Sequence, residues 1–271
     1  MEPLSQMNIR EVEEALYKNP SPRMLCACQN DPRLGVRRLA VRIVKQQQAQ
    51  AIEDARIQKL LVEEKKLWNQ GFLLLAGIDE AGRGPLAGPV VAAACILPAQ
   101  FDLSGLNDSK TLTESKREKI YTQIQAQAID YAIGSAEPAE IDVLNILQAT
   151  KLAMKRAVEG LTVRPHYLLI DALKLPDVHL PQLPLIGGDQ ISATIAAASI
   201  LAKVTRDRLM VELHALYPEY LFSKNKGYGT SEHMQVLRRL GPCPLHRRSF
   251  APVKQGTSVK LERKVGDAAE C

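Results

Sequence analysis

The chain lacks a long apolar run, and this argues against a membrane-spanning helix. None of its hydrophobic segments approaches the roughly 20 consecutive apolar residues that a span requires. The first residues, MEPLSQMNIREVEE, also lack the basic and then apolar order of a secretory signal. We therefore expect a cytoplasmic protein without membrane contact. Its 271 residues, 46% of them hydrophobic, suffice for one large domain and an appendage.

Cysteine and histidine are sparse, with five residues of each. The cysteines are scattered and odd in number, which does not suggest a disulfide framework. Cys26 and Cys28 could supply half of a zinc site, but no histidine precedes His166 and zinc needs about four ligands. Ordinary reduced thiols are the expected state.

The net charge is only +5, but it is unevenly distributed. Residues 71–223 carry 13 basic and 17 acidic side chains, whereas residues 224–271 carry 10 and 4. An acidic middle beside a basic end suits a polyanionic substrate held by Lys and Arg and a divalent metal held by carboxylates. On charge alone, a solvated basic tail is an equally good explanation.

Residues 1–70 are expected to form a helical N-terminal extension. A helix over 8–18 should end at Pro20 and Pro22, and a second helix should start at Asp31 and Pro32. A long helix is expected over 46–69, with Trp68 packing this segment on the main body. The region contains no cluster of catalytic residue types.

The sequence predicts an α/β domain with a mixed sheet over residues 71–253, which includes a helical and loop-rich C-terminal segment, and a flexible basic tail over 254–271. Short apolar strands are expected at 72–80, 90–97, 131–137 and 166–171. Helices are expected after Thr113, over 141–159 and after Asp189, with a proline-rich loop at 176–184.

Four acidic residues recur where strands end. Asp79 and Glu80 close the first strand, Asp171 closes another, and Asp189 stands just before a helix. If the strands are neighbours, the carboxylates converge at one edge of the sheet. Oxygen ligands of this kind select Mg²⁺ or Mn²⁺, and two such ions can cleave a phosphodiester. Asp189 could instead cap the following helix.

One geometric question concerns Asp79 and Glu80, because adjacent residues on a regular strand point to opposite faces. Both can reach one metal only if the strand ends or twists there, which Gly77 and Gly82 permit. The turn Gly82-Arg83-Gly84 does not have the spacing of a dinucleotide-binding loop. Its glycines allow close approach to a phosphate.

Asn107, Asp108, Ser109 and Lys110 form a polar group with one cation, which suits a phosphate contact. A second, basic and aromatic group lies near the end of the chain and comprises Lys224, Lys226, Tyr228, Arg247 and Arg248.

Seven stretches together resemble bacterial ribonuclease HII, the type 2 ribonuclease H, in the family's order across about residues 71–253. They are GIDEAGRGPLAGPVV, LNDSK, EIDVLNILQATKLAM, YLLIDA, ISATIAAASILAKVTRD, KNKGYGTSEH and HRRSFAPV. The resemblance implies a ribonuclease H-like fold with a mixed sheet. It also implies Mg²⁺- or Mn²⁺-dependent endonucleolytic cleavage of RNA in RNA–DNA hybrids and at single ribonucleotides in DNA. A comparable N-terminal extension occurs in some Gram-positive members.

The resemblance also implies roles for single residues. Asp79, Glu80, Asp171 and Asp189 would bind metal. Gly82, Arg83 and Gly84 would sense the ribose 2′-OH, and Tyr228 would stack on the adjoining deoxyribose. Asn107, Ser109 and Lys110 would hold substrate phosphates.

The chain departs from the family at Gly187, where members usually carry a lysine. That departure weakens the assignment of Asp189 and removes one phosphate contact. We expect a monomer without an obligate protein partner. Two rivals remain open: another metal-dependent nuclease of the same fold, such as an exonuclease or recombinase, and a non-catalytic module that binds hybrids.

Overall fold

The computed structural model describes residues 4–18, 21–102 and 104–254. The chain divides into two compact units, Met1–Lys59 and Leu60–Cys271. The sequence places the domain boundary later, between residues 70 and 71, after the helix Val62–Asn69, and that boundary stays a prediction. The basic tail expected at 254–271 lies, apart from Lys254, outside the described residues. None of the described helices has both the length and the hydrophobicity to cross a membrane.

The first unit is helical, as expected. It contains η1 (Leu4–Gln6), α1 (Ile9–Lys18), α2 (Pro22–Gln29) and most of α3 (Leu34–Leu60). Apolar residues at helical spacing meet in a small core that includes Val12, Leu16, Leu25, Cys28, Val36 and Leu39.

Two details of this unit differ from the sequence-based expectation. Pro22 starts α2 instead of ending a helix, because the Ser21 hydroxyl caps the helix by accepting from the Met24 N–H. Asp31 does not cap α3, which begins only at Leu34. Its carboxylate instead accepts from the backbone and side chain of Arg33.

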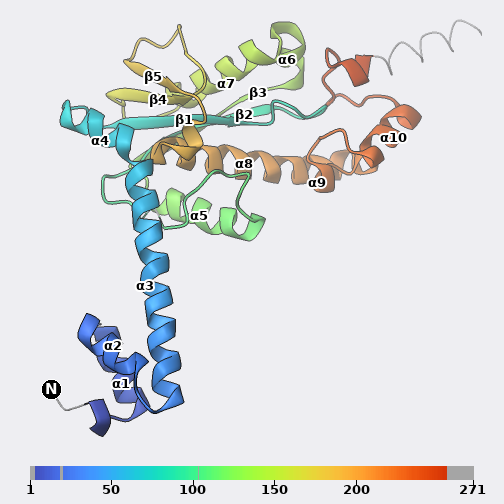
Figure 1. Cartoon of the computed structure of the whole chain (residues 1–271). Coiled ribbons are helices and arrows are strands. Elements are labelled where there is room, and N and C mark those ends of the chain that lie inside the picture. The colour runs from blue at the N-terminus through green and yellow to red at the C-terminus, as the bar shows by residue number, and fades with distance from the viewer. Residues whose placement is uncertain (1–3, 19–20, 103, 255–271) are drawn as a thin grey trace, which may run out of the picture. The chain divides into compact units, whose positions relative to one another are not determined.

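The second unit is built on a five-stranded mixed sheet, which confirms the predicted fold class (Figure 1). The strand order is β3-β2-β1-β4-β5. β1 pairs antiparallel with β2 and parallel with β4, and the outer pairs are antiparallel β2–β3 and parallel β4–β5. The bounds are β1 (Leu75–Ala81), β2 (Val90–Ile96), β3 (Asp130–Ala136), β4 (Tyr167–Asp171) and β5 (Gln182–Leu185).

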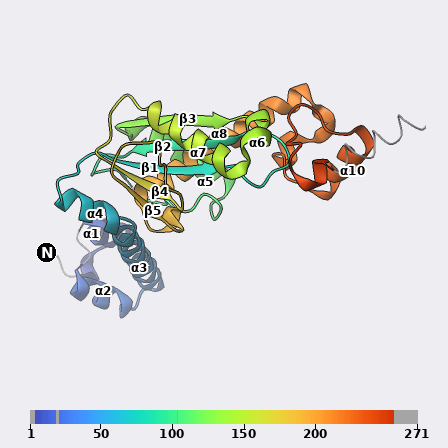
Figure 2. The same ribbon diagram turned by 90° about the horizontal axis from the view of Figure 1, so that it is seen from above.

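Helices cover both faces of the sheet (Figures 1 and 2). α7 packs on β2 and β3, and α8 packs on β1 and β2. α4 lies at the start of the unit, where Trp68 contributes to a core cluster with Leu67, Leu75 and Ile195. The helices are α4 (Val62–Asn69), α5 (Glu114–Gln127), α6 (Pro138–Leu144), α7 (Ile146–Glu159), α8 (Ala193–Leu216), α9 (Phe222–Asn225) and α10 (Ser231–Leu240), with short turns η2 (Gly188–Gln190) and η3 (Pro218–Tyr220).

Two expectations in this unit were wrong. The helix predicted over 141–159 is broken at Asn145, which has φ 70° and caps α7 by accepting from the N–H groups of Leu147 and Gln148. The proline-rich segment 176–184, predicted as a loop, contains the start of β5, since an edge strand tolerates the missing N–H of Pro184.

Sheet and helix lie in close contact where β1 crosses α8. Gly77 faces the first turn of α8, and a Cβ at this position would lie 2.0 Å from the Thr194 carbonyl carbon. The alanines in the first half of α8, such as Ala196 and Ala197, are fully buried. Small side chains on both elements therefore allow α8 to lie directly against the strand that ends in Asp79 and Glu80.

Candidate active site

Three carboxylates meet at one edge of the sheet. β1 and β4 run parallel with Ile78 opposite Ile170, so the next residues, Asp79 and Asp171, leave the two strands side by side. Glu80 joins them, and the three side chains offer oxygen atoms that all lie within 4.8 Å of one another. The parallel register thus brings together residues almost a hundred positions apart in the chain.

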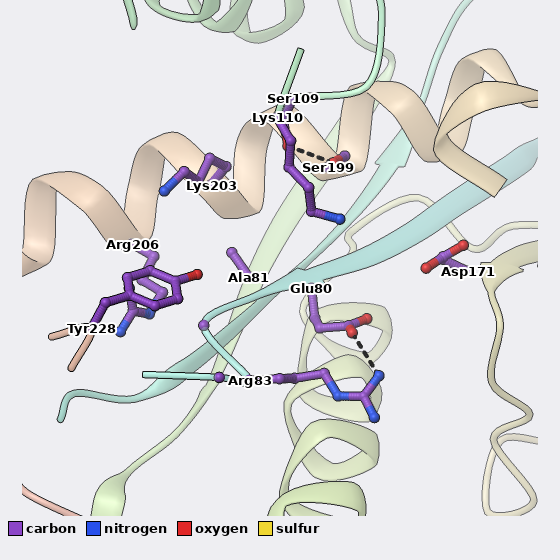
Figure 3. A pocket seen from close by; sticks show the side chains of 12 residues that line it. Glu80, Ala81, Arg83, Ser109, Lys110, Asp171, Ser199, Lys203, Arg206 and Tyr228 are labelled. Atoms are coloured by element: carbon purple, nitrogen blue, oxygen red, sulfur yellow. Dashed lines mark hydrogen bonds and ion pairs between the residues drawn. The ribbon is translucent and has the colours of Figure 1, made fainter. Parts of the chain in front are cut away.

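The adjacent residues Asp79 and Glu80 both reach this cluster although β1 continues to Ala81. The strand breaks immediately afterwards at Gly82, whose φ of +90° is one that glycine adopts without strain. Asp79 is only 6% exposed, and its Oδ1 accepts from the Glu80 N–H at 2.7 Å. The longer Glu80 side chain reaches the cluster from the neighbouring position and also pairs with Arg83 at 3.1 Å (Figure 3).

The electrostatics of the cluster favour a cation. Burial raises the pKa of Asp79 well above its ordinary value, and the nearby Glu80 and Asp171 raise it further. Burial also raises the pKa of Glu80, against the opposing effect of Arg83. Within the described residues, Glu80 Oε2 is buried without a hydrogen-bond partner. Mutual repulsion and an unpartnered acceptor are both relieved by a bound divalent cation, so these residues fit a metal.

Asp189 lies in η2, outside the group of three but near it. It is 6% exposed, and the Gly188 N–H beside it donates to Asp171 Oδ1 at 2.7 Å. Burial, and then repulsion from the adjacent Asp108, raises the pKa of Asp189 to about 6. The cap of α8 is Ser192, whose Oγ accepts from the Ile195 N–H, so the alternative interpretation of Asp189 as the helix cap is wrong.

Asp108 and Ser199 also belong to this neighbourhood. The sequence placed Asp108 in a polar group suited to a phosphate contact and not with the site carboxylates, and it did not single out Ser199. Asp108 is a buried carboxylate next to Asp189, and its only signal was its place between Asn107 and Ser109. Ser199 shares a 2.9 Å hydrogen bond with the Ser109 hydroxyl and a hydrogen bond with Asp79. It stands among alanines on α8, where it looked like one more small packing residue.

A cleft of about 480 Å³ opens beside the carboxylates (Figure 3). Eight of the predicted site residues line it, whereas Asp79, Asn107 and Asp189 do not. Lys203 and Arg206 of α8 add positive charge to its wall. The predicted residues that line it are Glu80, Gly82, Arg83, Gly84, Ser109, Lys110, Asp171 and Tyr228.

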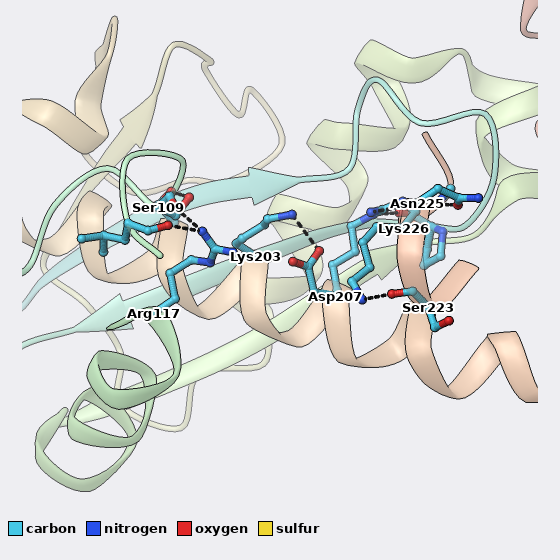
Figure 4. Close-up of polar contacts among 12 residues, drawn as sticks. Ser109, Arg117, Lys203, Asp207, Ser223, Asn225 and Lys226 are labelled. Carbon is cyan, nitrogen blue, oxygen red and sulfur yellow. Dashed lines mark hydrogen bonds and ion pairs between the residues drawn. The ribbon is translucent and has the colours of Figure 1, made fainter. Parts of the chain in front are cut away.

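Cations on the walls of the cleft are held in defined places. Burial by itself would lower the pKa of Lys110, but the surrounding carboxylates, Asp189 foremost, raise it above its usual value. Arg117 donates to the Ser109 carbonyl at 2.9 Å and so fixes the loop that carries Lys110 (Figure 4). Lys203 pairs with Asp207 at 2.7 Å. The cleft therefore joins carboxylates at one end to cations along its length.

Arg247 is a member of the basic and aromatic group near the end of the chain, but it is not a surface residue. Its side chain is fully buried and donates to the carbonyls of Gly82, Arg83 and Gly88 at 2.5–3.0 Å. Burial, and then repulsion from Arg206, lowers the pKa of Arg247 to about 9. The residue is thus a support of the Gly82-Arg83-Gly84 turn.

Arg206 supports the same region from α8. It is 1% exposed and donates to the carbonyls of Pro89, Ala87 and Lys226 at 3.0–3.1 Å. It thereby ties the segment after the turn to the loop that presents Tyr228. Of the other basic residues in the group near the end of the chain, Lys224 and Arg248 are exposed.

A chain of hydrogen bonds between buried histidines reaches the backbone of Tyr228. The Cys243 N–H donates to His246 Nδ1 at 3.0 Å, so the proton of neutral His246 is on Nε2. His246 Nε2 therefore donates to His233 Nε2 at 3.0 Å, and His233 Nδ1 donates to the Tyr228 carbonyl at 2.8 Å. Tyr228 itself is 46% exposed in the cleft, with its ring beside Gly84.

Comparison with known proteins identifies relatives over nearly the whole chain. The family described as "Ribonuclease HII" matches residues 76–253, and the family described as "Ribonuclease HII N-terminal domain" matches residues 8–68. The "Ribonuclease HII" of Desulfitobacterium hafniense (strain Y51) is 68% identical over 259 residues, which is 96% of this chain and 100% of the relative.

Solved structures share the fold. The ribonuclease H2 of Pyrococcus horikoshii OT3 is 26% identical with a TM-score of 0.58, covering 70% of this chain and 99% of that one. Bst-RNase HIII, solved in complex with Mn²⁺, is 20% identical with a TM-score of 0.55, covering 70% of this chain and 71% of that one. The chain therefore belongs to the ribonuclease HII family and is a ribonuclease H, a hydrolase that cleaves the RNA strand of RNA–DNA hybrids.

Proposed function

We propose that this ribonuclease H cuts internally, both in long RNA–DNA hybrids and at single ribonucleotides embedded in duplex DNA, with two divalent metal ions. The products would carry a 5′-phosphate and a 3′-OH. The observation that carries the proposal is the meeting of Asp79, Glu80 and Asp171 within 4.8 Å beside a cleft lined with cations. In a cell, such cuts would start the excision of ribonucleotides left in DNA during replication.

Asp79, Glu80 and Asp171 would hold the ions, and Asp189 would complete the site from η2. The donor set consists of carboxylate oxygens without histidine, which suits Mg²⁺ or Mn²⁺. When bound, two such ions activate a water and stabilise the leaving oxygen in phosphodiester cleavage. The protein then needs no nucleophilic side chain of its own, and its part is to place the phosphate against the carboxylate cluster.

The walls of the cleft would select the substrate. The turn of Gly82, Arg83 and Gly84 would read the ribose 2′-OH, the group that distinguishes RNA from DNA. Tyr228, exposed beside Gly84, would stack on the adjoining deoxyribose. The buried support from Arg247 favours this assignment, because a turn that recognises a single hydroxyl must hold its backbone still.

Phosphates of the substrate would lie along the loop that carries Asn107, Ser109 and Lys110. Lys110 lines the cleft with its ammonium among carboxylates, and Arg117 braces the loop from α5. The Ser109 hydroxyl already shares a hydrogen bond with Ser199, so its contact to a phosphate would compete with that bond. Lysine suits this position as a point charge for phosphate.

The test is cleavage of two substrates by the full-length protein: a DNA duplex with one ribonucleotide, and a long hybrid, each labelled at one end. Internal cuts at the ribonucleotide in Mg²⁺ or Mn²⁺ support the proposal, whereas products shortened stepwise from an end would identify an exonuclease. Hybrid binding without turnover in either metal would identify a binding module. A wild-type rate in Asp79→Asn would refute the metal assignment.

A further inference from the structure

Glu64 is a fully buried carboxylate that the catalytic assignment does not use. It lies in the first turn of α4, in a charged stretch that reads as a solvated helix face, yet its exposure is 0%. Its Oε1 accepts three hydrogen bonds from the start of α8. The donors are Ser192 Oγ at 2.7 Å, the Thr194 N–H at 3.0 Å and Thr194 Oγ1 at 3.1 Å.

The partners of Glu64 are the first donors of a 24-residue helix. Ser192 is the N-cap of α8, and Thr194 lies in its first turn, where N–H groups have no partner within the helix. A carboxylate is favoured at this end of a helix dipole. Glu64 Oε2 is nevertheless buried without a partner among the described residues, so the side chain occupies this position at a cost in desolvation.

The segment held by Glu64 leads directly to the carboxylate cluster. The Ser192 N–H donates to the Gly188 carbonyl at 2.8 Å, and the Gly188 N–H donates to Asp171 Oδ1 at 2.7 Å. Asp189 lies between these two attachments. Residues 188–194 are therefore fastened at one end by the carboxylate of Asp171 and at the other by the carboxylate of Glu64.

The same attachment fixes the position of α8 along β1. The backbone of Thr194 and Ile195 lies against Gly77, two residues before Asp79. One turn further along α8, Ser199 hydrogen-bonds to Ser109 and to Asp79. A shift of the first turn of α8 would therefore move Asp189 and Ser199 relative to Asp79.

We propose that Glu64 is a positioning residue for the metal site, which acts through Ser192 and Thr194 to hold Asp189 and the start of α8 in place. The inference rests on the proposed function, because it assumes that Asp189 and Asp79 bind the ions. Glu64 lies in the region matched by the N-terminal family, residues 8–68, although α4 belongs to the second compact unit. Glu64 thus lies outside residues 76–253, the region matched by the "Ribonuclease HII" family, and yet holds residues beside the proposed metal site.

The test compares full-length Glu64→Ala, Glu64→Gln and Glu63→Ala with the wild type. Glu63 is the matched control, because it is the preceding residue on the same helix and its carboxylate pairs within that helix, with Lys66 at 2.7 Å. Mn²⁺ binding is measured by titration calorimetry, and the Mn²⁺ concentration for half-maximal hybrid cleavage is measured separately. Thermal melting without metal reports on folding.

We expect Glu64→Ala to weaken Mn²⁺ binding about tenfold or more, in the range found for residues that orient metal ligands. Excess Mn²⁺ should restore most of the maximal rate. Glu64→Gln keeps an acceptor oxygen for Thr194 and should recover much of the affinity, and Glu63→Ala should match the wild type. A Glu64→Ala protein that melts earlier but binds Mn²⁺ with unchanged affinity would overturn the proposal, as would one that matches Glu63→Ala throughout.

If Glu64→Ala does not fold, Thr194→Val tests the proposal instead, because this variant removes one hydroxyl that donates to Glu64 and keeps the shape of the side chain. The expected loss of Mn²⁺ affinity in Thr194→Val is then several-fold, and an unchanged affinity in this variant overturns the proposal. Asp79→Asn distinguishes failure of the role of Glu64 from failure of the proposed metal site. Wild-type Mn²⁺ binding in Asp79→Asn would refute the metal site itself, whatever the result at Glu64.

Discussion

Gly77→Ala tests whether the contact between β1 and α8 sets the geometry of the active site. A Cβ at Gly77 would lie 2.0 Å from the Thr194 carbonyl carbon, 2.2 Å from its oxygen and 2.4 Å from the Ile195 nitrogen. Ordinary van der Waals contact starts at 3.4 Å, so strand and helix must separate by about 1.4 Å, the difference between 3.4 and 2.0 Å. All three atoms belong to the backbone, and no side-chain rotation relieves the clash.

Overpacking typically lowers the free energy of unfolding by about 1–3 kcal/mol. We expect the upper end of this range, because the clash is with helix backbone. For a unit of this size, a loss of about 3 kcal/mol lowers Tm by roughly 6–12 °C. Because Asp79 is two residues away, the displacement also reaches the carboxylate cluster. A misplacement of about 1 Å can lower the rate of catalysis about 100-fold.

The assay combines thermal melting with single-turnover cleavage of an RNA–DNA hybrid at saturating metal. Gly160→Ala is the matched control, since its new Cβ would meet the Ala132 side chain at 3.1 Å and the Arg156 carbonyl oxygen at 3.2 Å, contacts that a movement of a few tenths of an ångström relieves. It should show a smaller change in Tm and a wild-type rate. A Gly77→Ala protein with wild-type Tm and rate would refute the account of how α8 is placed.

Three further outcomes follow from the site. Asp79→Asn should abolish cleavage. In the presence of a chelator it should also raise Tm by a few degrees, because the substitution removes a buried charge that Glu80 and Asp171 repel. A lower Tm would contradict this. The pKa of Asp189 is raised to about 6 from 3.8, so the stability it contributes is fully present below about pH 3.8 and is lost as the pH rises through 6. Mn²⁺ competes with that proton, and the rise in Tm on adding Mn²⁺ should therefore be larger at pH 8 than at pH 5, which melting curves at both pH values will check. Arg247→Met should lower the free energy of unfolding by about 3 kcal/mol or more, because it leaves the carbonyls of Gly82, Arg83 and Gly88 unpartnered, and denaturant titration measures this loss. The same substitution should raise KM for the ribonucleotide duplex more than it lowers kcat, which steady-state kinetics will check.

The parts of the fold that could be predicted are those with strong local signals. An apolar run that ends in Asp79 and Glu80 predicted β1, and a similar run predicted Asp171 at the end of β4. Thr113 predicted the start of α5, and its hydroxyl caps that helix by accepting from the Lys116 N–H. The convergence of the strand ends also followed, because parallel neighbours place their last residues at one edge.

The parts that could not be predicted depend on partners far along the chain. Glu64 and Arg247 look like surface charges, since nothing near them in sequence shows that Thr194 or Gly82 will bury them. The break at Asn145 was hidden because its flanks, Leu144 and Ile146, continue an apolar helical pattern. Local periodicity describes single elements, whereas buried charge is a property of their assembly.

The support of the Gly82 turn by Arg247 has a consequence for synthesis of the protein. The two residues are 165 positions apart. At about 5–20 residues per second, a ribosome makes Arg247 roughly 8–33 s after it makes the turn. Throughout that interval the nascent chain has the first two carboxylates of its site but not the guanidinium that holds the neighbouring backbone. If the turn reads the ribose as proposed, substrate recognition is acquired late in translation, because a chain that ends before residue 247 lacks the guanidinium that holds this turn.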